Sequence, residues 1–162
     1  CFIDTPGAYP GIGAEERGQF EAIARSMLVM STLQVPIVTV VIGEGFSGGA
    51  LGIGVGDRIL MQEHAIYSVI TPEGYASILW KDSARAREAA EAIRIIARDI
   101  LELGVADKII PEPPGGAHKE PEAAAAMLGD ALAETLDELV KLKLEDLMQQ
   151  RYEKFRSIGN LK

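Results

Sequence analysis

The segment of this sequence that is most suited to binding a ligand through its backbone is rich in glycine. Seven glycines lie within fourteen residues: Gly43, Gly45, Gly48, Gly49, Gly52, Gly54 and Gly56. The apolar, β-branched run over 36–42 predicts a buried strand, and the small residues over 50–55 predict a tightly packed helix. The first amides of a helix lack intrahelical partners, and glycine lets a ligand oxygen approach them closely. The amides at this strand-to-helix turn are therefore candidate oxyanion donors, with close helix–sheet packing as the alternative reason for the glycines.

A second cluster of turn-forming residues follows the strand predicted over 1–4. The sequence DTPGAYPG over 4–11 contains Gly7, Ala8, Tyr9, Pro10 and Gly11. Ligands bind at the carboxyl ends of strands in parallel sheets, which favours a binding loop. On its own, the cluster fits equally well a rigid Pro/Gly turn with an aspartate cap.

Two nucleotide-binding motifs are rejected. A P-loop needs a lysine after its glycines, and the glycine cluster contains none. The spacing of Gly43, Gly45 and Gly48 matches a dinucleotide fingerprint. However, the acidic residue about 20 positions later is Glu63, which falls in a predicted short hairpin.

Ser47 lies in a Gly-x-Ser-x-Gly pattern that resembles a nucleophile elbow. A hydrolase would need a base beside it. The two histidines, His64 and His118, fall in a predicted turn and a Pro/Gly-rich loop, and nothing places either near Ser47. We interpret Ser47 as a helix N-cap.

The elements that must position these residues alternate between strands and helices. Strands are predicted over 1–4, 36–42, 58–61, 65–70 and 107–110. Helices are predicted from about Glu15, over 72–80, over 83–103 with a break and Gly104 as C-cap, and throughout the tail from Pro121. The first helix has an apolar stripe of Phe20, Ile23, Ala24, Met27 and Leu28. This alternation predicts an α/β fold with a mostly parallel, helix-covered sheet.

Composition narrows the function further. The 162 residues are 48% hydrophobic, and no apolar run approaches the roughly 18 residues of a membrane span. Sixteen basic against 24 acidic residues give a net charge of −8, which argues against nucleic-acid or membrane-surface binding. The single cysteine excludes an intrachain disulfide and a cysteine-based zinc site, and indicates a reducing compartment. The opening residues read as the second half of a strand, so we expect a fragment of a longer chain.

The motifs as a set resemble one family, the carboxyltransferase α subunit of bacterial or plastid multisubunit acetyl-CoA carboxylase. The resemblance rests on FIDTPGAYPG (2–11), AEERGQ (14–19), GGAL (48–51), YSVITPEG (67–74), SILW (77–80), IPEP (110–113) and GGAH (115–118). It covers essentially the whole sequence and corresponds to the C-terminal half of that subunit.

This resemblance implies a fold and an assembly. The fold would be a crotonase/ClpP-like spiral of ββα units. Residues 1–120 would form a carboxyltransferase core that lacks its N-terminal part, and 121–162 a helical extension packing on the core or on a partner. The partner would be a β subunit in an α2β2 assembly, with structural zinc on the β subunit only and no metal on this chain. The location would be the bacterial cytoplasm or the plastid stroma.

The resemblance also implies an activity, the first committed step of fatty acid biosynthesis. The carboxyl group of carboxybiotin, held on a biotin carboxyl carrier protein, is transferred to acetyl-CoA and gives malonyl-CoA. An ATP-dependent biotin carboxylase belongs to the wider complex. The freed ureido nitrogen of biotin can take the methyl proton, so no protein nucleophile is required. The resemblance assigns the amides of Gly48, Gly49 and Ala50 to catalysis. It assigns the carboxybiotin side to Gly7, Ala8, Tyr9, Pro10, Gly11, Gly45, Phe46 and Ser47.

One position departs from the family pattern GEGGSGGA. Phe46 replaces its fourth residue, and a left-handed backbone there would cost about 1–2 kcal/mol. With an ordinary backbone the ring fills a neighbouring pocket or narrows the biotin entrance. Two alternatives to the carboxyltransferase remain: a serine peptidase of the same spiral fold using Ser47, and a non-catalytic scaffolding subunit. A CoA hydratase or isomerase is weaker, since Glu44 is its one candidate carboxylate.

Overall fold

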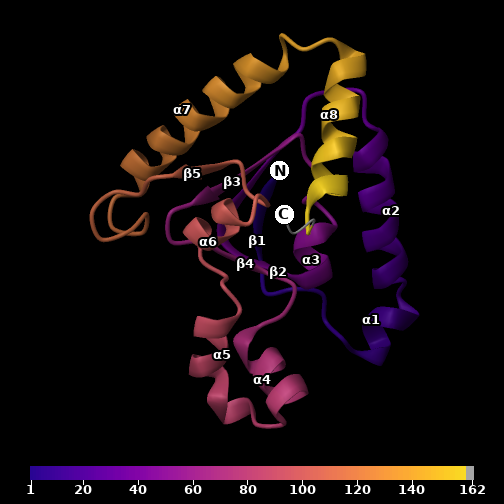
Figure 1. Cartoon of the computed structure of the whole chain (residues 1–162), viewed down its shortest axis with the longest axis vertical. Coiled ribbons are helices and arrows are strands. Elements are labelled where there is room, and N and C mark those ends of the chain that lie inside the picture. Colours follow the sequence, from indigo (N-terminus) through magenta and orange to yellow (C-terminus); the bar gives the residue numbers. More distant parts are fainter. Residues whose placement is uncertain (160–162) are drawn as a thin grey trace.

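A parallel sheet carries the glycine-rich segments. The computed structural model describes residues 1–159, and within them five strands form this sheet (Figure 1). The strands are β1 (Phe2–Thr5), β2 (Val38–Phe46), β3 (Arg58–Gln62), β4 (Ile66–Ser68) and β5 (Lys108–Ile110). Their order is β1-β2-β3-β5, with β4 pairing β2, and every pairing is parallel. The predicted α/β fold with a parallel sheet is therefore confirmed.

Strand β2 has two different neighbours along its length. Its residues 38–41 pair with β3, whereas residues 44–46 pair with β4. The predicted β3–β4 hairpin is therefore wrong, as is the predicted end of the strand at residue 42. The strand continues because residues 44–46 pair with β4, and glycine is required within it because neighbouring side chains occupy the space of the missing Cβ atoms. A Cβ on Gly43 would lie 2.5 Å from Asp4 Oδ1, and one on Gly45 would lie 2.6 Å from Tyr67 Cδ2.

Helices cover the sheet and extend beyond it. They are α1 (Ile12–Glu16), α2 (Gln19–Thr32), α3 (Ser47–Leu51), α4 (Pro72–Trp80), α5 (Ala86–Ala92), α6 (Ala97–Glu102), α7 (Pro121–Leu139) and α8 (Leu144–Ser157), with a 3₁₀ turn η1 (Ser83–Arg85). The first predicted helix is divided because Gly18 adopts a left-handed φ of 75°. Its predicted stripe is partly wrong: Phe20 and Leu28 are exposed, and Met30 is buried. The helix predicted over 50–55 begins earlier, at Ser47, and ends at Leu51.

Two apolar clusters lie on opposite faces of the sheet, because neighbouring strand residues point to opposite sides. Val41 and Met61 pack against Ala50 of α3 and Ile100 of α6. On the other face lies a second cluster, formed by Val38, Val40, Leu60 and Ile110 with Ala131 and Leu139 of α7 and Leu147 of α8. These clusters hold α3, α7 and α8 against the sheet, whose strand β2 contains Gly43 and Gly45.

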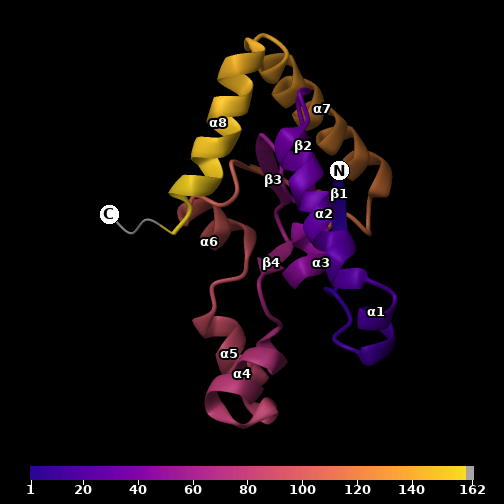
Figure 2. The ribbon, with the colours of Figure 1, turned by 90° about the vertical axis from the view of Figure 1, so that its right-hand side faces the viewer.

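Helices α4 and α5 with η1, residues 72–92, form an arm at the opposite end of the molecule from the α7–α8 turn (Figure 2). Helix α4 has the predicted bounds, and the Thr71 hydroxyl caps it by accepting from the Gly74 amide at 3.2 Å. We refer to the remainder of residues 1–159 as the body. No helix in this described part of the chain is both long enough and apolar enough to cross a membrane.

Candidate active site

The turn from β2 into α3 places its backbone strain at Ser47. Phe46 has an ordinary extended φ of −112°, and its side chain is 4% exposed. Ser47 has a φ of 53°, a conformation that costs a non-glycine residue about 1–2 kcal/mol. Phe46 therefore carries no left-handed backbone strain, because its φ is that of an extended residue, and its ring packs inside the protein. The predicted N-cap role of Ser47 is wrong, since Phe46 occupies that position and no side chain caps α3.

The two glycine clusters are in backbone contact. A Cβ on Gly49 would lie 2.9 Å from the carbonyl carbon of Gly7 and 3.0 Å from Thr5 Oγ1. Gly7 has a φ of 116°, and its amide donates to Thr5 Oγ1 at 3.2 Å. Glycine is thus required at both places, at Gly7 by conformation and at Gly49 by space. The loop after β1 and the first turn of α3 form one unit.

The first amides of α3 provide the donors of this unit. With Phe46 as the N-cap, the amides of Gly48 and Gly49 lie in the first turn and have no partner within the helix, whereas the Ala50 amide is in position to donate to the Phe46 carbonyl. Across residues 1–159, no hydrogen bond from another segment uses these three amides. Gly48 and Gly49 are half-buried, whereas Ala50 is 0% exposed within the apolar cluster. The accessible donors are therefore the two glycine amides.

Helix α2 forms the wall opposite α3. The Ser26 hydroxyl donates to the Gly52 carbonyl at 2.5 Å, and Ile23 Cδ1 lies 3.3 Å from where a Cβ on Gly48 would be. With its side-chain amide oriented so that both groups are satisfied, Gln19 donates to the Tyr9 carbonyl at 3.0 Å and accepts from the Tyr9 amide at 3.1 Å. Sequence reasoning missed these contacts. Gln19 lay in a quoted motif, Ile23 was assigned only to an apolar stripe, and Ser26 carried no signal.

A hollow of about 360 Å³ lies between these elements. It is lined by Thr5, Gly7, Ala8, Gln19, Ala22, Ile23, Ser26, Gly49, Gly52 and Ile53. None of these side chains is charged. The hollow therefore offers the Gly49 backbone and side-chain amide and hydroxyl groups to a neutral, oxygen-bearing ligand, whereas Gly48 and Ala50 do not line it. It contains no group suited to act as a base.

The remaining predicted residues lie elsewhere. Tyr9 and Pro10 are exposed outside the hollow, with the Tyr9 ring folded over Gly11. Gly45 is buried beneath Tyr67, and burial raises the pKa of the Tyr67 phenol. Ser47 lines a different, apolar pocket of about 430 Å³ on another side of α3.

The nucleophile interpretation of Ser47 gains no support from its surroundings. The apolar pocket lined by Ser47 contains neither histidine, and His118 lines a separate hollow with Ile42 and Leu128. The backbone amide of His64 donates to Glu112 Oε1 at 3.0 Å, and the His118 ring lies beside Gly116. The same part of the chain holds no group of three or more His, Cys, Asp or Glu residues suited to a metal ion.

Comparison with solved structures defines the class of protein. The fold is similar to a Pseudomonas malonate decarboxylase hetero-tetramer in complex with coenzyme A, with a TM-score of 0.68 and 17% identity over 93% of this chain and 59% of that chain. It is also similar to transcarboxylase 12S, with a TM-score of 0.61 and 22% identity over 78% of this chain and 26% of that chain. A probable enoyl-CoA hydratase from Mycobacterium thermoresistibile is also similar, with a TM-score of 0.55 and 18% identity over 94% of this chain and 63% of that chain. The chain is a crotonase-fold protein, as predicted.

Sequence comparison then gives the family. Residues 1–159 match the family model described as acetyl co-enzyme A carboxylase carboxyltransferase-like. Curated relatives named acetyl-coenzyme A carboxylase carboxyl transferase subunit alpha include those of Xanthomonas campestris pv. campestris strain B100, 60% identical over 98% of this chain, and Aquifex aeolicus, 58% identical over 99%. The chain belongs to this carboxyltransferase α family, and it spans about half (50%) of the length of these relatives.

Proposed function

We propose that this chain supplies the glycine-amide part of a carboxyltransferase site that moves a carboxyl group from carboxybiotin to acetyl-CoA, forming malonyl-CoA. The observation that carries the proposal is the backbone contact between Gly7 and Gly49, which joins both glycine clusters around unpaired amides. Membership of the family supports the substrate class. The product would enter fatty acid biosynthesis.

The residues of the hollow fit a biotin ureido group. That group is neutral and carries a carbonyl oxygen, and the hollow combines amide donors with uncharged walls. When bound, carboxybiotin supplies the carboxyl group, and its ureido nitrogen can accept the proton removed from acetyl-CoA. The Gly48 and Gly49 amides hold an oxygen on which negative charge develops, because fixed dipoles stabilise such charge without reorganisation. Ile23 and Ile53 supply large apolar side chains to the wall of the hollow.

The proposal includes partners that act with this chain. We infer a β subunit, because the relatives are named subunit alpha. An α2β2 assembly with structural zinc on that subunit is what the sequence resemblance implies. A biotin carboxyl carrier protein would deliver biotin, and an ATP-dependent biotin carboxylase would recharge it. Residues 1–120 would serve as the carboxyltransferase core and 121–162 as its helical extension. The bacterial cytoplasm or the plastid stroma is the corresponding location.

The reverse reaction tests this function. Biotin-dependent conversion of malonyl-CoA to acetyl-CoA would be measured with the full-length subunit that contains this chain, with and without a β subunit. We expect activity only in the mixture. Gly49→Val should abolish it because the side chain meets the Gly7 backbone, whereas Gly129→Val should retain it because no atom lies within 4 Å of a Cβ there.

Two outcomes would contradict the proposal. Loss of activity in Ser47→Ala together with peptide hydrolysis by the wild type would favour the serine peptidase. If the two subunits assemble without activity, and Gly49→Val does not change their assembly, the result would favour the scaffolding subunit.

A further inference from the structure

Arg151 on α8 is a charged side chain buried far from the hollow, with 2% exposure. Its guanidinium is bidentate to Asp57, with Nε to Oδ1 and Nη2 to Oδ2 both at 2.8 Å. Asp57, equally buried, also accepts the Ile37 amide at 2.6 Å. The pair therefore joins α8 to the starts of β2 and β3.

The remaining donors of Arg151 bind the end of α2. Nη1 donates to the carbonyls of Met30 at 3.0 Å and Leu33 at 2.7 Å, and Nη2 donates to the Val35 carbonyl at 2.8 Å. All five guanidinium N–H groups are thus used. The last carbonyls of a helix lack intrahelical partners. Arg151 donates to the carbonyls of Leu33 and Val35 just beyond α2 and adds a second donor to the Met30 carbonyl, which also accepts from the Leu33 amide at 3.4 Å.

The other end of α2 forms the wall of the hollow. Gln19 pairs with the Tyr9 backbone, Ile23 packs at Gly48, and Ser26 donates to Gly52. Helix α2 runs without interruption from Gln19 to Thr32 and lies alongside α8 (Figure 1). We call the hydrogen bonds from Arg151 to Asp57 and to the carbonyls of Met30, Leu33 and Val35 the clamp. Movement of α2 at the clamp would therefore be transmitted to both the Gly7 loop and α3.

We propose that Arg151 is a positioning residue for carboxyl transfer, because its clamp on the end of α2 sets the separation of the Gly7 loop from the Gly48 and Gly49 amides. This inference rests on the proposed function. Lysine cannot replace arginine here, since a single ammonium cannot reach Asp57 in bidentate fashion and three carbonyls together. Misplacement of reacting groups by about 1 Å can reduce rates by the order of 10²-fold.

The test compares three variants of the full-length subunit, each assayed with its β subunit well below its own unfolding temperature. Arg151→Lys breaks the clamp and keeps the charge. The double variant Arg151→Met with Asp57→Leu removes the buried charges and leaves the α2 carbonyls without the clamp. Leu147→Ala is the matched control. It lies on the same helix, is 3% exposed, and packs in the apolar cluster with Val38 and Leu60.

For Arg151→Lys we expect a fall in kcat of about 10-fold or more, an unchanged KM for malonyl-CoA, and faster hydrogen exchange of the hydrogen-bonded amides over 52–54. The double variant should regain thermal stability without regaining kcat. Leu147→Ala should lower the unfolding temperature and leave both kcat and this exchange unchanged.

The inference is overturned if Arg151→Lys loses no more kcat than Leu147→Ala, or if the double variant recovers both stability and kcat. Inactivity of the wild-type mixture would instead refute the proposed function. In that case the exchange of the 52–54 amides still decides whether the clamp controls the packing of α3.

Discussion

The body and the arm are held together by different kinds of contact. The Arg151–Asp57 pair in the body joins residues 94 positions apart and is almost fully buried. In the arm, Tyr75 meets Trp80 edge-on at 5.4 Å between ring centroids, and the Arg85 guanidinium lies 4.3 Å above the Trp80 ring. The arm contacts are local and partly exposed. The body should therefore unfold as one unit, whereas the arm can open by itself.

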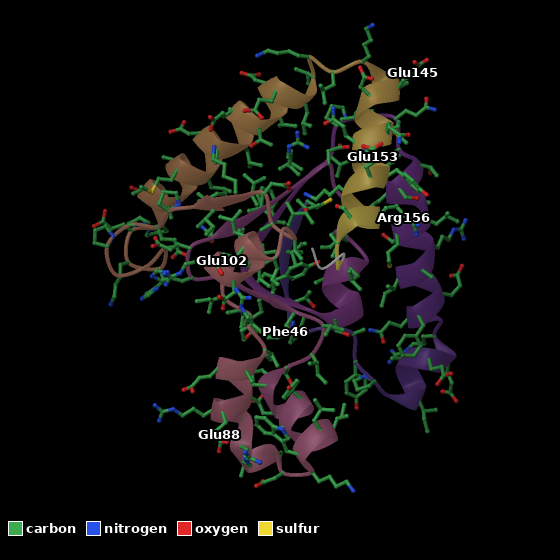
Figure 3. The ribbon with its side chains drawn as sticks, viewed as in Figure 1. Phe46, Glu88, Glu102, Glu145, Glu153 and Arg156 are labelled. Atoms are coloured by element: carbon green, nitrogen blue, oxygen red, sulfur yellow. The ribbon has the colours of Figure 1, made fainter. Side chains whose placement is uncertain are left out.

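The burial of apolar side chains agrees with this difference. Ile78 and Leu79 of the arm are 68% and 60% exposed, whereas Val40 and Leu60 of the body are fully buried. Figure 3 shows Phe46 near the junction of body and arm and Glu88 near the far end of the arm. Strand β4, which leads into the arm, pairs with the strand that ends at Phe46.

The largest effect is expected at Phe46. Phe46→Ala should lower the free energy of unfolding by about 3–5 kcal/mol, because it leaves a cavity where a ring was buried. Phe20→Ala is the control, since that ring is 49% exposed. Urea denaturation measures both. A loss below about 1 kcal/mol with faster carboxyl transfer would show instead that the ring narrows the biotin entrance.

A substitution in the arm should lower the free energy of unfolding of the whole protein less than Phe46→Ala does. Trp80→Ala removes the partner of both Tyr75 and Arg85. Amide exchange over 72–92 should become much faster, while the body changes by less than about 1 kcal/mol. Hydrogen-exchange mass spectrometry reports both regions at once. Equal acceleration in body and arm would show that the two unfold together.

Arg85→Met should have a smaller effect on the same exchange. It removes the contact with Trp80 and the 2.6 Å ion pair with Glu88, whose side chains are both exposed. Because salt screens exposed charges, the difference from wild type should shrink at about 1 M salt. Arg87→Met is the matched control. An Arg85→Met effect that is insensitive to salt would assign the contribution to ring stacking alone.

The smallest effect is a pH dependence confined to the body. Burial raises the pKa of Tyr67. Above the usual value of about 10, the folded protein keeps a proton that the unfolded chain releases, and stability falls as pH rises. Tyr67→Phe should remove this decrease.

Lys154 has the opposite effect on stability, because burial lowers its pKa below the usual value of about 10.5. Between the lowered pKa and about 10.5 the unfolded chain keeps a proton that the folded protein has released, so stability rises with pH. The measurement is therefore the difference between wild type and variant in urea denaturation across the alkaline range. Parallel curves would refute the prediction.

Much of this architecture could be predicted from local pattern. The strand and helix types were correct, α4 had its observed bounds, and the positive φ of Gly104 agrees with its predicted place at a helix end. The extension of β2 was missed because glycine normally disfavours strands, and only the side chains of Asp4 and Tyr67 explain Gly43 and Gly45.

In the candidate site, sequence named both glycine clusters but neither the wall nor its support. Ser26 and Arg151 act through partners that are 26 and up to 121 positions away. No periodicity or motif encodes such pairs. Spatial proximity created by the fold is what gives these side chains their roles.

The double pairing of β2 limits how the length of this chain can vary. The register of residues 38–41 is set by β3, and that of residues 44–46 by β4. One residue inserted between them would reverse the facing of every side chain on one side of the insertion. Insertions should therefore be tolerated at the tip of the arm, at residues 81–82, and not at residues 42–43. A library of single-residue insertions would show this segment as the most intolerant of the sheet.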